Sequence, residues 1–566
     1  MSLQFITGNS GNGKTKYLFN RIVKEAKANP RDNYLVIVPE QFTMQTQRQL
    51  VDLSENKAIM NIDVLSFKRL AYRVFDELGI TNLTVLEETG KNLVLRKLAA
   101  QEADKLGVIG RNLNRIGYIS EVKSLLSELV QYNISPEELG RYIVSGRLSD
   151  TLSDKLKDVL VLYEAFEKFM QDKYITAEEI LNVLSNVAEE SAILRNSVIA
   201  FDEFTGFTPI QNQLIKKLFV ISKKIYVTLT IDCREDIFKS RGMQELFDMP
   251  KRTVKSLTEM AAFYGIEVEE PIILDKNYRL AENEELSFME QQLFRKRRGS
   301  FKKAPKHIHI DCLRDPKQEL TKIARRINEL VRNENLRYRD IAIVTGDVNI
   351  YAGYVREIFD KYNIPYFIDA TQEILFHPFI EFIRSIPDIA AQNFSADAVF
   401  RFLRCGFSEL LDSEIDVLEN YVLACGVRGK SAWDKKWVRL PKHKAGYDIE
   451  LLNQSREYIM ELLKPVYQVF SDKKSTVKDY VLAIYKLIVL LDIPDKLAKK
   501  EQALLDAGDQ TASKEYGQIY KIVMQLFEKY VAVLGDECMD AEEFTQILDA
   551  GLDAADVAVI PRDTTL

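Results

Sequence analysis

The segment Gly8-Asn9-Ser10-Gly11-Asn12-Gly13-Lys14-Thr15 constrains this chain more than any other feature, because it matches the pattern G-x-x-x-x-G-K-[ST]. It follows an apolar run at residues 3–7 and opens an amphipathic stretch at residues 14–28 with helical spacing. In such loops the glycines turn backbone N–H groups toward phosphate oxygens, the lysine contacts the β- and γ-phosphates, and the threonine hydroxyl can ligate Mg²⁺. We therefore predict a parallel α/β fold in which these eight residues bind ATP with Mg²⁺.

The rest of the N-terminal half alternates short β-type runs with helical patterns, which predicts a parallel sheet covered by helices. The expected strands are residues 3–7, 34–38, 62–65, 197–201 and 224–231. From about residue 87 to 190 apolar residues recur every three or four positions and strand signals are missing. We therefore predict a first α/β domain over 1–86 and 191–300, interrupted by a helical domain over 87–190.

A second α/β pattern follows, and we interpret residues 301–376 as the start of a second parallel-sheet domain. The expected strands and helices are residues 308–312, 317–333, 341–344, 351–362 and 365–368. From 377 to 566 the pattern is helical, which predicts a second helical insertion. The last residues have no tail character, so we expect the chain to be a portion of a longer protein.

Composition narrows the possible functions. A chain of 566 residues is too long for one core at ~100–200 residues per domain. With a net charge of −7, nucleic acid must bind in a local channel and not over a uniformly basic surface. The sequence has neither an apolar stretch of ~18–20 residues nor a secretory signal, so we expect a cytoplasmic protein without membrane contact. Five scattered cysteines and four histidines offer no metal-ligand spacing, so we expect no metal beyond the Mg²⁺ held with ATP.

Two adjacent carboxylates, Asp202 and Glu203, directly follow the apolar run at 197–201. At the end of a strand, Asp202 would hold Mg²⁺ and Glu203 would polarise the attacking water. Such a pair is also common as a solvated turn or a helix cap. The phosphate loop upstream favours the metal-binding interpretation.

Several segments resemble the motifs of UvrD-like superfamily 1 helicases. Residues 202–211 resemble the second motif, residues 231–238 the third, and residues 341–366 the fourth. The AddB family, subunits of the bacterial AddAB helicase–nuclease, is a closer resemblance. It rests on residues 36–43 (Val-Ile-Val-Pro-Glu-Gln-Phe-Thr), on residues 63–73, and on the phosphate loop lying almost at the N-terminus.

The resemblance implies two RecA-like domains, each interrupted by a helical accessory domain. It also implies an AddA-like helicase–nuclease partner in a heterodimer, single- and double-stranded DNA as ligands, and a role in double-strand-break repair by homologous recombination in the bacterial cytoplasm. In the family a nuclease domain with its own Mg²⁺ and a 4Fe-4S cluster lies further along the chain. We expect none of its ligands within these 566 residues.

In that family the helicase-like part scans single-stranded DNA for Chi, a short recombination hotspot sequence. Amides and hydroxyls can read base edges, aromatic rings can stack on bases, and a guanidinium can reach a phosphate or a guanine. The matching positions are Gln41, Thr43, Phe67, Arg69, Tyr72 and Phe207. By residue type alone, the same six positions also fit a helix surface and core aromatics.

Departures from the motor pattern bear on the mechanism. Glu235 stands where motor helicases place a glutamine, and Thr345-Gly346-Asp347 stands where they place an arginine. A cation on the γ-phosphate is worth ~10³–10⁵ in rate, so we expect ATP binding with slow or no hydrolysis. The alternatives are an active superfamily 1 helicase and a P-loop switch or kinase.

A basic run, Arg295-Lys296-Arg297-Arg298, lies between the two α/β patterns. It is interpreted either as a solvated linker or as a hinge that contacts phosphates beside a DNA channel.

Overall fold

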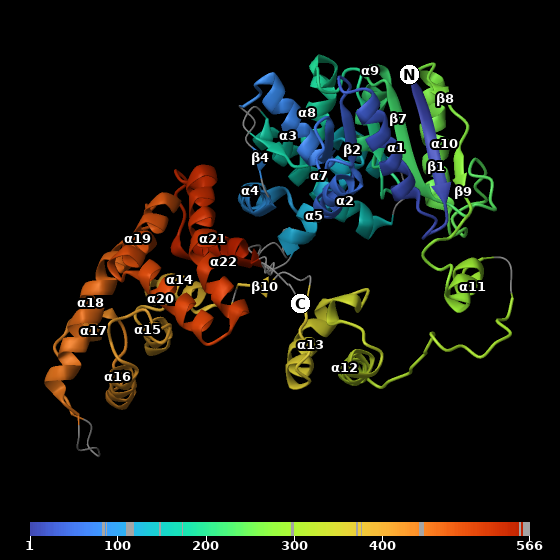
Figure 1. Cartoon of the computed structure of the whole chain (residues 1–566). Helices are drawn as coiled ribbons and strands as arrows, with labels where there is room; N and C mark the ends of the chain where they lie inside the picture. The colour runs from blue at the N-terminus through green and yellow to red at the C-terminus, as the bar shows by residue number, and fades with distance from the viewer. Residues whose placement is uncertain are drawn as a thin grey trace. The chain divides into compact units, whose positions relative to one another are not determined.

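The computed structural model describes residues 1–81, 85–86, 88–108, 118–145, 149–171, 174–295, 299–368, 372–374, 376–440, 447–553 and 556–557. The chain forms two compact units (Figure 1). The first comprises Met1–Leu86 with Ser124–Asp311, and the second comprises Glu87–Lys123 with Cys312–Leu566.

A seven-stranded sheet in the order β3-β2-β6-β7-β1-β8 forms the centre of the first unit, with β9 also paired to β1. All of these pairings are parallel. The strands are β1 (Ser2–Gly8), β2 (Tyr34–Ile37), β3 (Ile62–Leu65), β6 (Val198–Phe201), β7 (Lys224–Thr230), β8 (Glu267–Val268) and β9 (Ile272–Leu274). The α/β class and the five predicted strands of this sheet are confirmed, whereas β8 and β9 were not predicted.

Helices cover both faces of the sheet, and this accounts for the nearly continuous apolar character of its strands. Ile6, Val36 and Ala200 face a cluster with α1 (Lys14–Ala28) and α2 (Thr43–Leu53). Side chains one position away in the strands pack on the opposite face, among the remaining covering helices. Those helices are α3 (Phe67–Leu78), α8 (Ile180–Val187), α9 (Pro209–Ile221) and α10 (Asp248–Phe263).

The predicted insertion at 87–190 is largely helical, with one exception. Its helices are α4 (Glu88–Gln101), α5 (Tyr118–Gln131), α6 (Pro136–Val144), α7 (Asp150–Met170) and α8, with the short η2 (Ala103–Lys105) and η4 (Ala188–Glu190). β4 (Val85–Leu86) pairs with β5 (Ile175–Thr176), so a short strand lies inside the segment predicted to have none. α4 packs on α21 and α22 and therefore belongs to the second unit.

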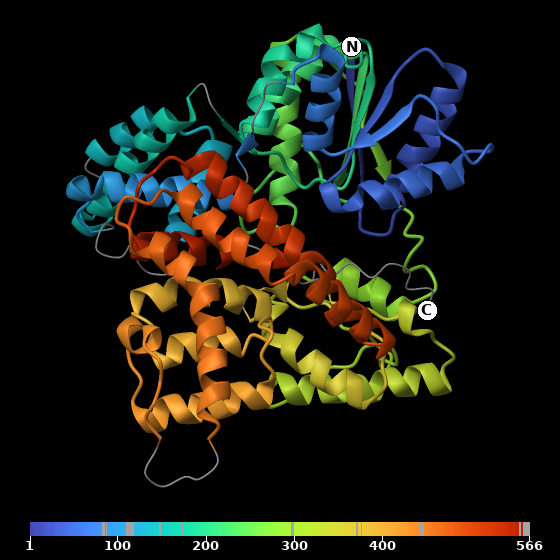
Figure 2. The same cartoon turned by 90° about the vertical axis from the view of Figure 1, so that its left-hand side faces the viewer.

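Most of the second unit is a helical assembly with one large apolar core, drawn orange to red for its later helices in Figure 2. Trp433 and Trp437 lie buried in that core with ring centroids 5.2 Å apart. The helices are α14 (Pro378–Ala391), α15 (Ala396–Leu403), α16 (Asp412–Cys425), α17 (Lys430–Asp434), α18 (Ile449–Ser471), α19 (Val477–Leu490), α20 (Ile493–Asp506), α21 (Gln510–Leu534) and α22 (Ala541–Asp553). One strand pair, β10 (Gln372–Glu373) with β11 (Asp556–Val557), accompanies them.

The three strands predicted at 308–312, 341–344 and 365–368 do not form, and those predictions are wrong for this structure. Each segment lacks regular secondary structure, and Ile310 and Val344 are both 93% exposed. A strand needs a hydrogen-bonded neighbour, and no described residue pairs with these segments. Helices α12 (Pro316–Asn333) and α13 (Asn349–Lys361) do form, as predicted, and pack on each other. A second RecA-like domain therefore stays a prediction.

Candidate nucleotide-binding site and nucleic-acid surface

The glycine-rich loop runs from the end of β1 to the start of α1, and two of its glycines have left-handed backbone. Gly11 has φ +87° and Gly13 has φ +78°, a region that side chains with a Cβ rarely adopt. A Cβ on Gly11 would also lie 2.9 Å from the Arg279 Cβ. Asn12 N–H donates to the Asn9 carbonyl at 3.2 Å and closes the turn. These positions therefore need glycine for the loop to curl over the N-terminus of α1.

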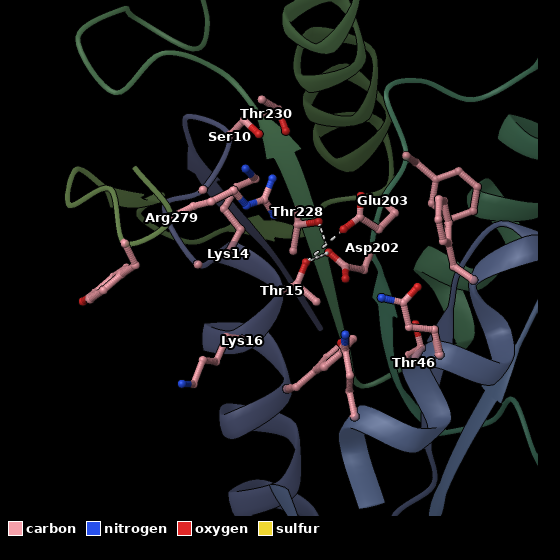
Figure 3. Close-up of a pocket in the computed structure, with 18 of the residues that line it drawn as sticks. Ser10, Lys14, Thr15, Lys16, Thr46, Asp202, Glu203, Thr228, Thr230 and Arg279 are labelled. Carbon is pink, nitrogen blue, oxygen red and sulfur yellow. Dashed lines mark hydrogen bonds between the residues drawn. The ribbon is translucent and has the colours of Figure 1, made fainter. Parts of the chain in front are cut away.

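Lys14 and Thr15 begin α1 and point into the pocket over the carboxyl edge of the sheet (Figure 3). The Lys14 ammonium donates to the Asn9 carbonyl at 3.0 Å, so it is held within the loop. Burial lowers the pKa of Lys14, while the carboxylates of Glu203 and Asp202 oppose that shift. A positive charge that is partly removed from water, and that faces two carboxylates, is well suited to contact a phosphate.

Asp202 follows β6 and is only 1% exposed, with Oδ1 as the acceptor for the Thr228 hydroxyl of β7. The Thr15 hydroxyl lies 3.3 Å from Asp202 Oδ1 and 3.2 Å from Glu203 Oε1 (Figure 3). Burial raises the pKa of Asp202, and the neighbouring Glu203 charge adds to this. Glu203 has φ +64°, a left-handed backbone that is uncommon for a residue with a side chain. The two predicted carboxylates thus lie beside the phosphate loop.

The donor set fits a magnesium ion. Asp202 Oδ2 is buried and has no hydrogen-bond partner among the described residues, which leaves one carboxylate oxygen free for a ligand. The Thr15 hydroxyl and the Asp202 carboxylate are hard oxygen donors, the kind that Mg²⁺ prefers. Thr15 and Asp202 would hold the ion, which supplies positive charge to phosphate oxygens when bound.

The structure adds two residues to this pocket that the sequence patterns did not identify, Tyr278 and Arg279. They follow β9, and their backbone N–H groups donate to the Gly11 carbonyl at 3.0 and 3.4 Å. Both side chains are exposed and line the same cavity of about 750 Å³ as Lys14 and Glu203. The signal available in the sequence was the apolar run Ile272–Leu274, with Asn-Tyr-Arg at 277–279 after two intervening residues. It becomes informative only once β9 is known to pair with β1.

The two departures from the motor pattern are not among the residues that line this cavity. Glu235 pairs with the buried Lys251, Oε2 to Nζ 2.7 Å, and Lys251 also contacts Glu245 at 3.3 Å. Residues 345–347 belong to the second unit. Arg279, in contrast, brings a guanidinium into the pocket from within the first unit (Figure 3). Slow hydrolysis therefore does not follow from residues 345–347 alone, because the pocket has a second cation.

The six predicted DNA-reading residues all belong to the first unit but differ in exposure. Thr43 is 4% exposed, and its hydroxyl donates to the Glu40 carbonyl at 3.0 Å. Phe67 is 7% exposed and stacks on Phe201, with ring centroids 5.8 Å apart. Phe207 is half-buried, with its ring 5.2 Å from Phe201. Thr43 and Phe67 therefore have core positions with no surface to offer a base.

The other three predicted residues are on the surface. Gln41 is exposed on the short helix η1 (Glu40–Phe42), and Tyr72 of α3 is 40% exposed. Arg69 Nε pairs with Glu40 Oε1 at 3.2 Å, so α3 and η1 meet at this point. Gln41 and Arg69 thus follow the neighbouring strands β2 and β3 at the same edge of the sheet.

From the sequence we expected no metal beyond the Mg²⁺ held with ATP and no membrane contact. Within the described ranges no group of three or more His, Cys, Asp or Glu side chains could hold a metal ion. In the same part of the chain no helix is both long and apolar enough to cross a membrane.

A parallel sheet with a glycine-rich loop after its first strand, and a buried carboxylate after β6, is the arrangement of a helicase-like α/β protein. The family model described as "ADDB, N-terminal" matches residues 5–290. The chain belongs to the AddB family, as the sequence resemblance predicted.

Curated relatives agree over nearly the whole chain. Three of them, each named as a subunit of an ATP-dependent helicase/deoxyribonuclease, come from Lachnoclostridium phytofermentans, Clostridium acetobutylicum and Clostridioides difficile. They are 38%, 31% and 31% identical, with 99% of this chain and 50%, 49% and 49% of the relatives covered. The chain therefore spans about half the length of the curated relatives it matches.

Proposed function

We propose that this chain is the nucleotide-binding, DNA-contacting portion of a subunit of an ATP-dependent helicase/deoxyribonuclease that acts in recombinational repair of double-strand breaks. The relatives are named as subunits of an ATP-dependent helicase/deoxyribonuclease, and a subunit implies a partner, for which we propose an AddA-like helicase–nuclease. The observation that best supports the proposal is one cavity lined by Lys14, Thr15, Asp202 and Glu203. Oδ2 of Asp202 has no hydrogen-bond partner among the described residues.

In this proposal the first unit binds Mg²⁺–ATP. Lys14 contacts the β- and γ-phosphates, Thr15 and Asp202 hold the metal, and Glu203 orients a water. The exposed Tyr278 ring stands beside Gly13 and offers a face on which the base can stack.

Nucleotide binding is tested by titrating a fluorescent ATP analogue with Mg²⁺ into the wild-type chain and Lys14→Ala. Loss of charge-assisted hydrogen bonds at ~1.5–3 kcal/mol predicts affinity at least tenfold weaker. Lys24→Ala, an exposed lysine further along α1, is the matched control and should bind as wild type. Equal affinity of all three proteins would refute the proposed site.

We also propose that Gln41, Arg69 and Tyr72 contact single-stranded DNA and contribute to reading Chi. Their support is exposure at one edge of the sheet together with the family's residue types. Gln41→Ala and Arg69→Ala should reduce discrimination among a panel of single-stranded oligonucleotides by ~1–3 kcal/mol per site. Thr43→Ser, at a buried position in the same segment, is the control, and an unchanged preference in the first two variants would contradict the reading role.

A second candidate is a chain with its own ATPase activity, and Arg279 favours it. A guanidinium beside Lys14 supplies the charge that phosphoryl transfer requires. If the chain hydrolyses ATP, Arg279→Ala should lower kcat by roughly a hundredfold or more while nucleotide affinity changes less. DNA-stimulated hydrolysis at a rate unaffected by Arg279→Ala would count against this role, and absence of hydrolysis in wild type would favour the scanning subunit.

A further inference from the structure

A network of buried and half-buried polar side chains leads from the phosphate loop to helix α11 (Glu284–Gln292). The Asn9 side-chain amide donates to Glu290 Oε1 at 2.9 Å. Arg295 then donates to the same Glu290 oxygen at 3.2 Å and to Asp232 Oδ2 at 3.0 Å. None of Glu290, Arg295 and Asp232 lines the nucleotide pocket. The loop is thus connected, through two further side chains, to the residues that follow β7.

Most of the network is shielded from water, and its most exposed member, Glu290, has a side chain that is 18% exposed. Asn9 is 5% exposed, Asp232 is 1% exposed, and the Arg295 side chain is 8% exposed with its guanidinium over the Phe247 ring. Although burial alone would raise the pKa of Asp232, hydrogen bonds from Arg234 and Arg295 hold that pKa well below its ordinary value. Buried charges persist only when they are paired, so loss of one member leaves the others uncompensated. The geometry is therefore tightly determined.

Asn9 is the residue at which this network meets the proposed nucleotide contacts. Its carbonyl accepts from the Lys14 ammonium at 3.0 Å, and its side-chain oxygen accepts from Cys233 N–H at 2.9 Å. A phosphate that draws Lys14 toward itself must compete with the Asn9 carbonyl for that ammonium. Any such exchange changes the hydrogen bonding of the residue that holds Glu290.

The segment after α11 is docked on that helix. Glu285 accepts the backbone N–H groups of Lys306 at 2.7 Å and His307 at 2.8 Å. The Phe288 and Phe301 rings pack with centroids 5.4 Å apart. A shift of α11 would therefore carry residues 299–308 with it. In the sequence, the basic run at 295–298 lies between α11 and Phe301. Its residues 296–298 lie outside the described residues.

We propose that Glu290 and Arg295 are positioning residues that couple occupancy of the phosphate loop to the placement of α11 and the segment at 299–308. The inference rests on the proposed nucleotide binding. Coupling between two sites is reciprocal, so disturbing Glu290 or Arg295 must also change nucleotide affinity, typically by roughly 5–150-fold. In this proposal Arg295 transmits the change through its hydrogen bonds to Glu290 and Asp232. This differs from both interpretations of the basic run at 295–298, a solvated linker and a hinge that contacts phosphates.

The test combines two measurements on the whole chain, affinity for a Mg²⁺-bound non-hydrolysable ATP analogue and amide hydrogen exchange over residues 284–308 with and without it. Glu290→Gln retains an acceptor for Asn9 but loses the charge that faces Arg295, and Arg295→Gln removes the guanidinium. Glu282→Gln, just before the same helix, is the matched control, because Glu282 is exposed and is not part of the network or of the contacts named above that dock residues 299–308.

We expect the analogue to change exchange over 284–308 in wild type and in Glu282→Gln. Glu290→Gln and Arg295→Gln should bind at least about fivefold more weakly and lose that change. If wild type binds the analogue but exchange is unaffected and both variants bind normally, the coupling is refuted while the proposed function stands. If wild type does not bind the analogue at all, both are refuted. Circular dichroism checks that each variant is folded. If Arg295→Gln folds poorly, Arg295→Lys takes its place, and because it keeps the charge we expect its affinity to lie between those of wild type and Glu290→Gln.

Discussion

Residues 34–38 and residues 341–344 have the same kind of sequence, short runs rich in Val, Ile, Leu or Ala, yet they differ in structure. The first run becomes β2, paired on one side with β3 and on the other with β6. The second run is irregular, with Val344 93% exposed where Val36 is fully buried. Apolar β-type residues are therefore compatible with a strand but not sufficient for one, because a strand forms its backbone hydrogen bonds with neighbouring strands.

The helices of the two regions teach the complementary lesson. α12 and α13 form beside the irregular segments, since the hydrogen bonds of a helix lie within the helix itself. They bury a small shared core that includes Leu320, Ile327 and Phe359. Local sequence is thus sufficient for the helices of the second α/β pattern and insufficient for its strands.

The largest expected effect comes from a matched pair of valine substitutions. Val36→Ala should cost roughly 2–3 kcal/mol of the stability of the first unit, from about 0.8 kcal/mol per buried methylene plus a cavity term. Val344→Ala should change stability by less than about 0.5 kcal/mol, because its side chain contacts water. Native-state hydrogen exchange of the β2 and β6 amides under increasing urea measures the first effect. A large loss in Val344→Ala would mean that residues 341–344 form a strand in solution.

The parts of the site that could be predicted from sequence are those encoded by short motifs. The loop at 8–15 has fixed spacing, and a strand followed by Asp202 and Glu203 has one place in a parallel sheet, at the carboxyl edge. Arg279 could not be predicted, because it lies far from Lys14 in the sequence and comes near it only through the pairing of β9 with β1. Phe67 could not be predicted as a core residue, because an aromatic at the first turn of α3 fits either face of that helix.

A pH effect is expected in the helical core of the second unit, which does not depend on the irregular segments. His377 is the N-cap residue before α14, is 3% exposed, and accepts from Phe379 N–H at 3.1 Å through Nδ1. Burial lowers the pKa of His377 to about 4, from an ordinary value of about 6.5. A lowered pKa means that the unfolded chain takes up the proton first, so stability is lost as pH falls from about 6.5 toward 4.

The expected slope is about 1.4 kcal/mol per pH unit in that window. His377→Asn retains a capping acceptor without the titration, and its unfolding should show a correspondingly flatter dependence on pH. Urea unfolding followed by amides of α14 and α18 between about pH 6.5 and 5 distinguishes the two proteins. Identical pH profiles would show that the pKa of His377 is the same in the folded and the unfolded chain, which contradicts the prediction.

The smallest effect tests whether helices are encoded equally well in both regions. Thr208 caps α9, which packs on the seven-stranded sheet, and its hydroxyl accepts from Gln211 N–H. Asp315 caps α12, and its carboxylate accepts from Gln318 N–H at 2.8 Å. Removing either cap, with Thr208→Ala or Asp315→Ala, should cost about 1 kcal/mol, because a cap acts on the first turn of its own helix. Hydrogen exchange of the first-turn amides of α9 and α12 measures both. If Asp315→Ala unfolds α12 altogether while Thr208→Ala only frays α9, packing on the sheet contributes more to helix stability than the cap does. Helices would then depend on their neighbours as well, and the contrast between helices and strands would be smaller.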